Sequence, residues 1–177
     1  HMITPRVVDI SHYNRIAADG FQQAAAAGIW GVINKATESV SYVDDTYARN
    51  RKAAKEAGLL WGAYHFVRPG NMARQVDHFL LHAAPDDKTL LALDWEVANV
   101  SPNEASEFLR LVAEKTGRKP ILYSGHTAKD TLGSRVDAFL GSHKLWLAQY
   151  ANSWTVQRSW QRPWLWQYSG DKLGPMP

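Results

Sequence analysis

The chain has 177 residues, of which 45% are hydrophobic, 21% charged and 11% aromatic. This composition supplies enough apolar residues for a folded core and excludes disordered, collagen-like and low-complexity proteins. The absence of cysteine excludes disulfides, thiolate metal sites and a cysteine nucleophile. Lysine and arginine exceed aspartate and glutamate by 20 to 17, and the positive charges are spread along the chain. This balance favours a mildly anionic partner such as a cell-wall polymer and does not require nucleic acid.

The chain is expected to be one soluble domain. No stretch approaches the roughly 18 consecutive apolar residues that span a bilayer, and residues 3–5 open the chain without the basic-then-apolar pattern of an export signal. His1 and Met2 look like the remnant of an affinity tag. Residues 3–177 are therefore expected to form a single domain, without membrane insertion.

Short apolar runs alternate with helical segments along the whole chain, which is typical of a parallel sheet covered by helices. Seven runs are predicted strands: residues 7–10, 30–35, 59–66, 90–96, 120–124, 144–150 and 164–168. Four helices are predicted between them, at residues 21–27, 45–57, 72–84 and 102–116. The clearest helix start is Ser101-Pro102-Asn103-Glu104, which has the pattern of a capping box with proline at the first helical position. Helical signals weaken after residue 126, and residues 153–162 are predicted to form a Trp-containing loop.

This order of elements predicts an α/β barrel. No glycine-rich phosphate loop follows the first strand, so a barrel is preferred over a doubly wound sheet. A complete eightfold barrel typically has about 250 residues, so a chain of this length is expected to form an irregular or abbreviated one.

The predicted strand at residues 90–96 carries the most informative acidic pair. Strand alternation places Leu91, Leu93 and Trp95 on one face and Asp94 and Glu96 on the other. Both acids fall at the carboxyl end of the strand, where barrel enzymes place their chemistry. At about 3.3 Å per residue the two Cα atoms lie roughly 6.6 Å apart, so both carboxyl groups can reach one glycosidic bond.

Mutual repulsion raises the pKa of one member of such a pair and keeps that member protonated near neutral pH. Asp9, at the corresponding end of the first strand, is expected to bring a third carboxylate to the same mouth. Spacing alone leaves another interpretation open, in which Asp94 and Glu96 cap the following loop or pair with arginines.

Seven segments, taken in order, resemble the motifs of glycoside hydrolase family 25, the Chalaropsis-type lysozymes. They are Asp9-Ile10-Ser11-His12-Tyr13-Asn14, Ile33-Asn34-Lys35-Ala36-Thr37-Glu38, Gly62-Ala63-Tyr64-His65-Phe66, Leu93-Asp94-Trp95-Glu96, Leu122-Tyr123-Ser124, Leu145-Trp146-Leu147-Ala148-Gln149-Tyr150 and Trp164-Leu165-Trp166-Gln167-Tyr168. The resemblance covers about residues 6–170. It implies an irregular β/α barrel that cleaves the β-1,4 bond between N-acetylmuramic acid and N-acetylglucosamine in peptidoglycan, with Glu96 as the general acid and Asp94 and Asp9 beside it.

The chain departs from the family pattern at three places. Asn34 replaces an aliphatic residue, and Ser39 replaces a glycine. The family's last strand, with a further aspartate, is absent before the chain stops at Pro177. We therefore expect an incomplete barrel, as a monomer whose open strand edges favour self-association.

Four further residues are candidate substrate-binding groups. Tyr64 and Tyr123 offer a stacking surface and a hydroxyl to an acetamido sugar, and the resemblance favours this interpretation over core packing. Lys35 lies inside an apolar strand, where an ion pair with a mouth carboxylate competes with a snorkelling surface lysine. Gln149 belongs to one of the resembling motifs and completes the set.

The sequence thus predicts a muramidase in which Asp94 assists attack by the substrate's own acetamido group. The alternatives are an inactive cell-wall-binding module on the same scaffold and a chitinase-like hydrolase. No cofactor is expected. His78 and His82 lie one helical turn apart, but no third ligand is evident, so no metal site is predicted.

Overall fold

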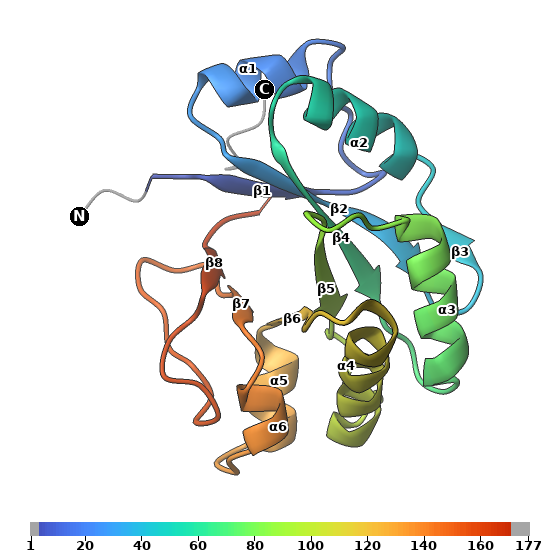
Figure 1. The fold of residues 1–177 in the computed structure, drawn as a ribbon. Helices are drawn as coiled ribbons and strands as arrows, with labels where there is room; N and C mark the ends of the chain where they lie inside the picture. Colours follow the sequence, from blue (N-terminus) through green and yellow to red (C-terminus); the bar gives the residue numbers. More distant parts are fainter. Residues whose placement is uncertain (1–3, 171–177) are drawn as a thin grey trace.

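The computed structural model describes residues 4–170. In this part of the chain seven strands form one parallel sheet in the spatial order β1-β2-β4-β5-β6-β7-β8 (Figure 1). Their bounds are β1 Val7–Ile10, β2 Gly31–Glu38, β4 Leu60–Phe66, β5 Leu90–Asp94, β6 Ile121–Ser124, β7 Leu145–Ala148 and β8 Leu165–Gln167. All seven strands predicted from the sequence are confirmed, and each pairs in parallel with its neighbours in this order.

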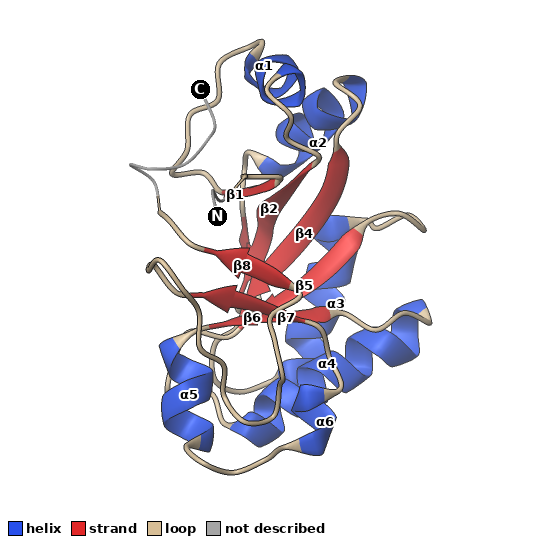
Figure 2. Ribbon diagram, turned by 90° about the vertical axis from the view of Figure 1, so that its left-hand side faces the viewer, coloured by secondary structure: helices blue, strands red, loops and turns tan. Residues whose placement is uncertain are grey.

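Helices connect the strands and lie on the outer side of the curved sheet (Figures 1 and 2). The four predicted helices are confirmed within two residues at each end, as α1 Gly20–Ala26, α2 Tyr47–Glu56, α3 Met72–Ala83 and α4 Pro102–Thr116. The predicted capping box forms at α4, where the Ser101 hydroxyl accepts from the Glu104 backbone N–H and the Glu104 carboxylate accepts from the Ser101 N–H, each at 3.1 Å. None of the helices within residues 4–170 is long and apolar enough to cross a membrane.

Three short elements were not predicted. Strand β3 (Tyr42–Val43) pairs antiparallel with the end of β2. Helices α5 (His126–Leu132) and α6 (Ala138–Gly141) have seven and four residues. A two-residue strand cannot display a hydrophobic period, and α5 and α6 lie after residue 126, where the helical signals of the sequence weaken. Residues 153–162 contain neither helix nor strand, as predicted for the Trp-containing loop.

The sheet separates two apolar clusters, as the alternation along β5 predicts. Leu91, Leu93 and Trp95 belong to the outer cluster, which the helices cover. Ala92 belongs to the inner cluster, which fills the barrel together with Ile33, Ile121, Tyr123 and Trp146. Because the inner side chains fill the barrel interior, the side chains that follow them at the carboxyl ends of the strands are left at its mouth.

The barrel is open between its first and last strands. Among the described residues, β1 pairs only with β2 and β8 pairs only with β7. Figure 2 shows β8 across a gap from β1. The expected incomplete β/α barrel is therefore confirmed for the part of the chain that the structure describes.

Candidate active site

The carboxyl ends of the strands surround a groove of about 280 Å³. Six of the seven residues predicted for the site line it, and they come from five different strands and the segment after β5. They are Asp9, Lys35, Tyr64, Asp94, Glu96 and Tyr123. Parallel pairing explains this convergence, because it brings the carboxyl ends of all strands to one edge of the sheet.

Asp94 is the most buried acid of the groove. It is the last residue of β5 and is only 4% exposed. Burial raises the pKa of Asp94 well above its usual range, and the charges of Glu96 and Asp9 raise it further. Its Oδ1 atom has no hydrogen-bond partner among the described residues. The groove therefore holds a buried carboxyl oxygen that can accept a hydrogen bond from a ligand.

Glu96 lies just past the end of β5, two residues beyond Asp94. The residue is exposed, so a ligand in the groove can reach its carboxyl group. The surrounding protein atoms nevertheless raise the pKa of Glu96 by desolvation, and the charge of Asp9 adds to the effect. The nearby charge of Glu96 also raises the pKa of Asp94, so the two carboxyl groups are electrostatically coupled. Two coupled acids lose their protons in separate steps, and Glu96 is the more exposed of the two.

Asp9 is held by a residue that the sequence did not predict for the site. The Gln167 amide nitrogen donates to both Asp9 carboxyl oxygens at 2.9 Å, while its amide oxygen accepts from the Tyr123 hydroxyl at 2.5 Å. Gln167 ends β8, so this contact spans the open side of the barrel. The signal in the sequence was its position at the end of a predicted strand, where an amide side chain is as well placed as a carboxylate.

The two predicted tyrosines meet over a buried tryptophan. The ring of Trp146 makes edge contacts with Tyr123 at 4.4 Å and Tyr64 at 6.3 Å between centroids. Burial raises the pKa values of both tyrosines, and the nearby charge of Asp94 raises them further, so both hydroxyls stay protonated. These rings line the groove beside the acids, and their role in sugar binding stays a prediction.

Lys35 lines the groove, but its ion-pair partner differs from the predicted one. Its ammonium group lies 2.7 Å from the Glu38 carboxylate, and Glu38 is also paired with Arg68 at 3.0 Å. The rings of Tyr42 and Phe66 flank the same ammonium. The pair therefore forms at the end of β2, because a residue three positions along the chain is nearer than the acids across the barrel.

Gln149 does not line the groove among the described residues. Its amide oxygen accepts from the Thr155 backbone N–H at 2.8 Å and from the Lys129 ammonium at 3.3 Å. These bonds tie down the loop that follows β7. The local structure therefore gives Gln149 a role in holding this loop.

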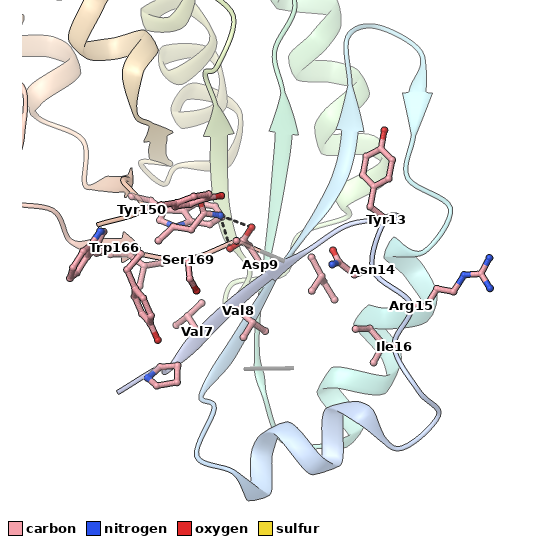
Figure 3. A pocket seen from close by; sticks show the side chains of 17 residues that line it. Val7, Val8, Asp9, Tyr13, Asn14, Arg15, Ile16, Tyr150, Trp166 and Ser169 are labelled. Carbon is pink, nitrogen blue, oxygen red and sulfur yellow. Dashed lines mark hydrogen bonds between the residues drawn. The ribbon is translucent and has the colours of Figure 1, made fainter. Parts of the chain in front are cut away.

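A second cavity of about 330 Å³ adjoins the groove on the open side of the barrel (Figure 3). Asp9, Tyr13, Tyr150 and Gln167 line both spaces, so the two are continuous. The dashed lines in Figure 3 mark the hydrogen bonds that reach Asp9. A ligand longer than one sugar unit can therefore extend past Asp9.

The histidine pair considered as a metal site is engaged elsewhere. His78 contacts the Tyr42 carbonyl oxygen at 2.7 Å, and its ring packs edge-on against His82. Among residues 4–170 no group of three or more His, Asp or Glu side chains is arranged to hold a metal ion.

Comparison with known proteins identifies the family. The profile of Glycosyl hydrolases family 25 matches residues 8–174. The N,O-diacetylmuramidase of Chalaropsis sp. is 30% identical over 190 residues, which cover 92% of this chain and 89% of the relative. YegX of Escherichia coli K12 is 31% identical over 72% of this chain, and the chain spans about half the length of that relative.

The fold has a similarly extensive match. The bacterial lysozyme structure from Streptomyces coelicolor superposes with a TM-score of 0.85 at 25% identity, covering 96% of this chain and 85% of the other. The family profile, the relatives and the solved structures all match most of the chain. The region matched by the profile contains every acid of the groove. The chain belongs to glycoside hydrolase family 25, a family of lysozyme-type glycosidases.

Proposed function

We propose that this chain is an N-acetylmuramidase that hydrolyses the β-1,4 bond between N-acetylmuramic acid and N-acetylglucosamine in peptidoglycan. The observation that carries the proposal is the pairing of a buried acid, Asp94, with an exposed one, Glu96, in a groove that raises the pKa of both. Family membership supports the reaction class. The site of action that follows is the bacterial wall, in the periplasm or outside the cell.

In the first step Glu96 acts as the general acid. Its proton goes to the glycosidic oxygen as the C1–O bond breaks, and the electron pair of that bond leaves with the oxygen. The carbonyl oxygen of the substrate's 2-acetamido group attacks C1 from the other face and forms a cyclic, positively charged intermediate. Glu96 is left as a carboxylate.

Asp94 orients and charges the acetamido group. Its Oδ1 atom, which has no partner within the described residues, is suited to accept the acetamido N–H. That hydrogen bond favours the ionised form of Asp94, and the charge of Asp94 in turn favours the protonated form of Glu96. The buried carboxylate then stabilises the positive charge that develops on the acetamido nitrogen.

In the second step Glu96 acts as the base. It takes a proton from water as the water oxygen attacks C1, and the acetamido group is released unchanged. Two displacements at C1 return the original anomeric configuration, so the product is expected to retain it. Inversion would instead indicate direct attack by water.

Digestion of purified peptidoglycan tests the proposal, with mass analysis of the reducing ends and NMR of the first-formed anomer. Reducing N-acetylmuramic acid with retained configuration is the expected product. Glu96→Gln should lower turnover by at least about 10³-fold without changing the melting temperature, since it removes the proton but keeps the shape. Wall binding without new reducing ends would overturn the enzyme assignment, and preferential cleavage of chitin oligomers would move the specificity to a chitinase type.

A further inference from the structure

Tyr13 is an exposed aromatic residue to which the two-step scheme gives no task. It is 81% exposed, so folding gains little from burial of its ring. It lies in the loop after β1 and lines both the groove of the acids and the adjoining cavity. In the view of Figure 3, Tyr13 lies on one side of Asp9 and Tyr150 on the other. A ligand that extends from the groove past Asp9 therefore passes the Tyr13 ring.

The Tyr13 ring packs against the ring of its neighbour His12. The two ring centroids are 4.0 Å apart, and the ring planes are tilted by 39°. His12 is held in turn by Asp44, whose Oδ2 atom accepts from the His12 backbone N–H at 2.8 Å and lies 3.0 Å from the ring Nδ1. Because both contacts end on one oxygen atom, they fix the His12 ring relative to its own backbone.

Asp44 is well suited to anchor this contact. Its side chain is buried, and its Oδ1 atom accepts from the Thr46 backbone N–H at 2.9 Å and from the Thr46 hydroxyl at 2.6 Å. Burial raises the pKa of Asp44, but the hydrogen bonds from Thr46 and His12 hold it below its usual range. An ionised carboxylate can only accept hydrogen bonds, so the Nδ1 of His12 is the donor.

The backbone around Tyr13 is also fixed by hydrogen bonds. The Asn14 side-chain oxygen accepts from the Ser11 N–H at 3.0 Å, and the Ser11 carbonyl accepts from the Asn14 N–H at 2.9 Å. The Ser11 hydroxyl accepts from the Tyr13 N–H at 3.3 Å. An exposed ring whose backbone and supporting ring are both held loses little conformational entropy when a ligand packs on it. This arrangement favours binding and contributes little to the core.

The chemistry of the Tyr13 ring matches a sugar. A pyranose ring presents C–H groups on its faces and hydroxyls around its edge, and tyrosine presents an apolar ring face and one hydroxyl. We propose that Tyr13 is a glycan-binding residue that stacks on a sugar ring of the peptidoglycan strand, and that His12, held by Asp44, is its positioning residue. The identity of the ligand rests on the proposed function.

The test is a calorimetric binding titration in the Glu96→Gln background, which prevents hydrolysis of the ligand. The probe is a soluble strand of alternating N-acetylglucosamine and N-acetylmuramic acid without stem peptides. Tyr13→Ala is expected to weaken binding about 10-fold, whereas Tyr13→Phe keeps the ring and should stay within about threefold of the parent. Trp30→Ala removes an aromatic side chain that is 60% exposed and lines neither cavity, so this matched control should leave the affinity unchanged.

A double-mutant cycle tests the positioning role of His12. His12→Ala leaves the Tyr13 ring without its support and is expected to weaken binding about threefold. In the Tyr13→Ala background the same change should have no further effect on affinity, because the ring that His12 holds is gone. An equal effect of His12→Ala in both backgrounds would show a merely structural role and would overturn the positioning role.

Three results would overturn the glycan-binding role of Tyr13. They are an unchanged affinity in Tyr13→Ala, an equal loss in Tyr13→Phe, and a loss seen only with fragments that carry stem peptides, which would make the peptide the ligand. In turnover assays Tyr13→Ala should raise KM by about the factor lost in binding, with a smaller change in kcat. If the unmodified protein releases no new reducing ends, the proposed function fails, and the binding titration still decides the role of Tyr13.

Discussion

The first half of the barrel, from β1 to α4, and the second half, from β6 to β8, are held together by different means. Strands β2 and β4 have eight and seven residues, and helices α2 to α4 have 10 to 15. In the second half β7 and β8 have four and three residues, and the helices have seven and four. Regular hydrogen bonding therefore supplies more of the order in the first half.

In the second half, side chains satisfy the loop carbonyls instead. The indole N–H groups of Trp160 and Trp166 donate to the carbonyls of His143 and Gln149, each at 2.9 Å. The Gln157 amide donates to two further carbonyls between α5 and α6. The three groove acids lie in the first half, whereas neutral Tyr123, Trp146 and Gln167 come from the second. The comparison teaches that the more regular half supplies the three acids of the groove and the less regular half supplies neutral side chains beside them.

Trp160→Ala should be the most damaging of these changes, because it removes both a loop hydrogen bond and a large buried side chain. Trp160 is 8% exposed. We expect a loss of about 3–5 kcal/mol in unfolding free energy, measured by chemical denaturation. Trp30→Ala, at a residue that is 60% exposed, is the control and should cost less than about 1 kcal/mol. Equal losses would show that indoles do not fasten the second half.

The first half has its own buried polar network, centred on His65. The ring contacts the Thr37 hydroxyl at 2.7 Å and the Gln75 amide oxygen at 2.8 Å. Gln75 in turn fastens the loop after β4 through the carbonyls of Arg68 and Gly70. Burial lowers the His65 pKa from 6.5 to about 4, so the folded protein holds the ring neutral.

This shift predicts acid lability. The His65 ring takes up a proton below about pH 6.5 in the unfolded chain, but only near pH 4 in the folded chain. The free energy of unfolding is therefore highest above pH 6.5 and falls as the pH drops towards 4. The loss is on the order of 3 kcal/mol across that window. Unfolding free energies of the unmodified protein and of His65→Gln, measured from pH 7 to pH 4, should diverge accordingly. If the two unfolding free energies change in parallel with pH, the acid lability does not come from His65.

The same division explains what the sequence could and could not predict. Long periodic segments such as β4 and α4 were predicted almost to the residue, because each one displays a hydrophobic face. The alternation along β5 also predicted that Asp94 and Glu96 share the barrel mouth. Helices α5 and α6 were missed because the helical signals of the sequence are weak there and tertiary contacts hold the chain instead. One such contact is the hydrogen bond that the Asp137 N–H donates to the Ser159 hydroxyl.

Residue roles that depend on distant partners were equally hidden. Lys35 was predicted to pair with one of the acids at the barrel mouth, but its partner is Glu38. A sequence pattern does not show which of these acids lies nearer to the Lys35 ammonium group. Gln167 escaped prediction because its significance comes from Asp9, 158 positions earlier in the chain. Spacing predicts which end of a strand a side chain reaches, and only the folded structure shows which neighbour it meets.

Asp94→Asn should separate stability from activity. Asp94 ionises near 3.8 in the unfolded chain, and its pKa is raised in the folded one. Its stabilising contribution is therefore full below pH 3.8 and falls as the pH rises through the folded pKa. Asparagine cannot ionise, so relative to the unmodified protein the variant should be more stable at pH 7 than at pH 3.5, while hydrolysis falls by about 10²-fold or more. Chemical denaturation of the variant and the unmodified protein at both pH values measures this change in stability, with the exposed Asp130→Asn as control. A stability difference that does not change with pH would contradict the prediction.

The smallest expected effects compare one helix cap from each half. The Ser101 hydroxyl accepts the Glu104 N–H at the start of α4, and the Asp137 carboxylate accepts the Leu140 N–H, at 2.9 Å, at the start of α6. Ser101→Ala leaves a donor of a 15-residue helix unpaired and should cost about 1 kcal/mol of global stability. Asp137→Ala should cost about 0.5 kcal/mol globally, because a four-residue helix adds little regular structure, yet it should increase amide exchange locally around residues 138–142. Global denaturation with hydrogen exchange distinguishes the two responses. Equal losses of global unfolding free energy in the two variants, without faster amide exchange at α6, would show that the two halves unfold as one cooperative unit despite their different construction.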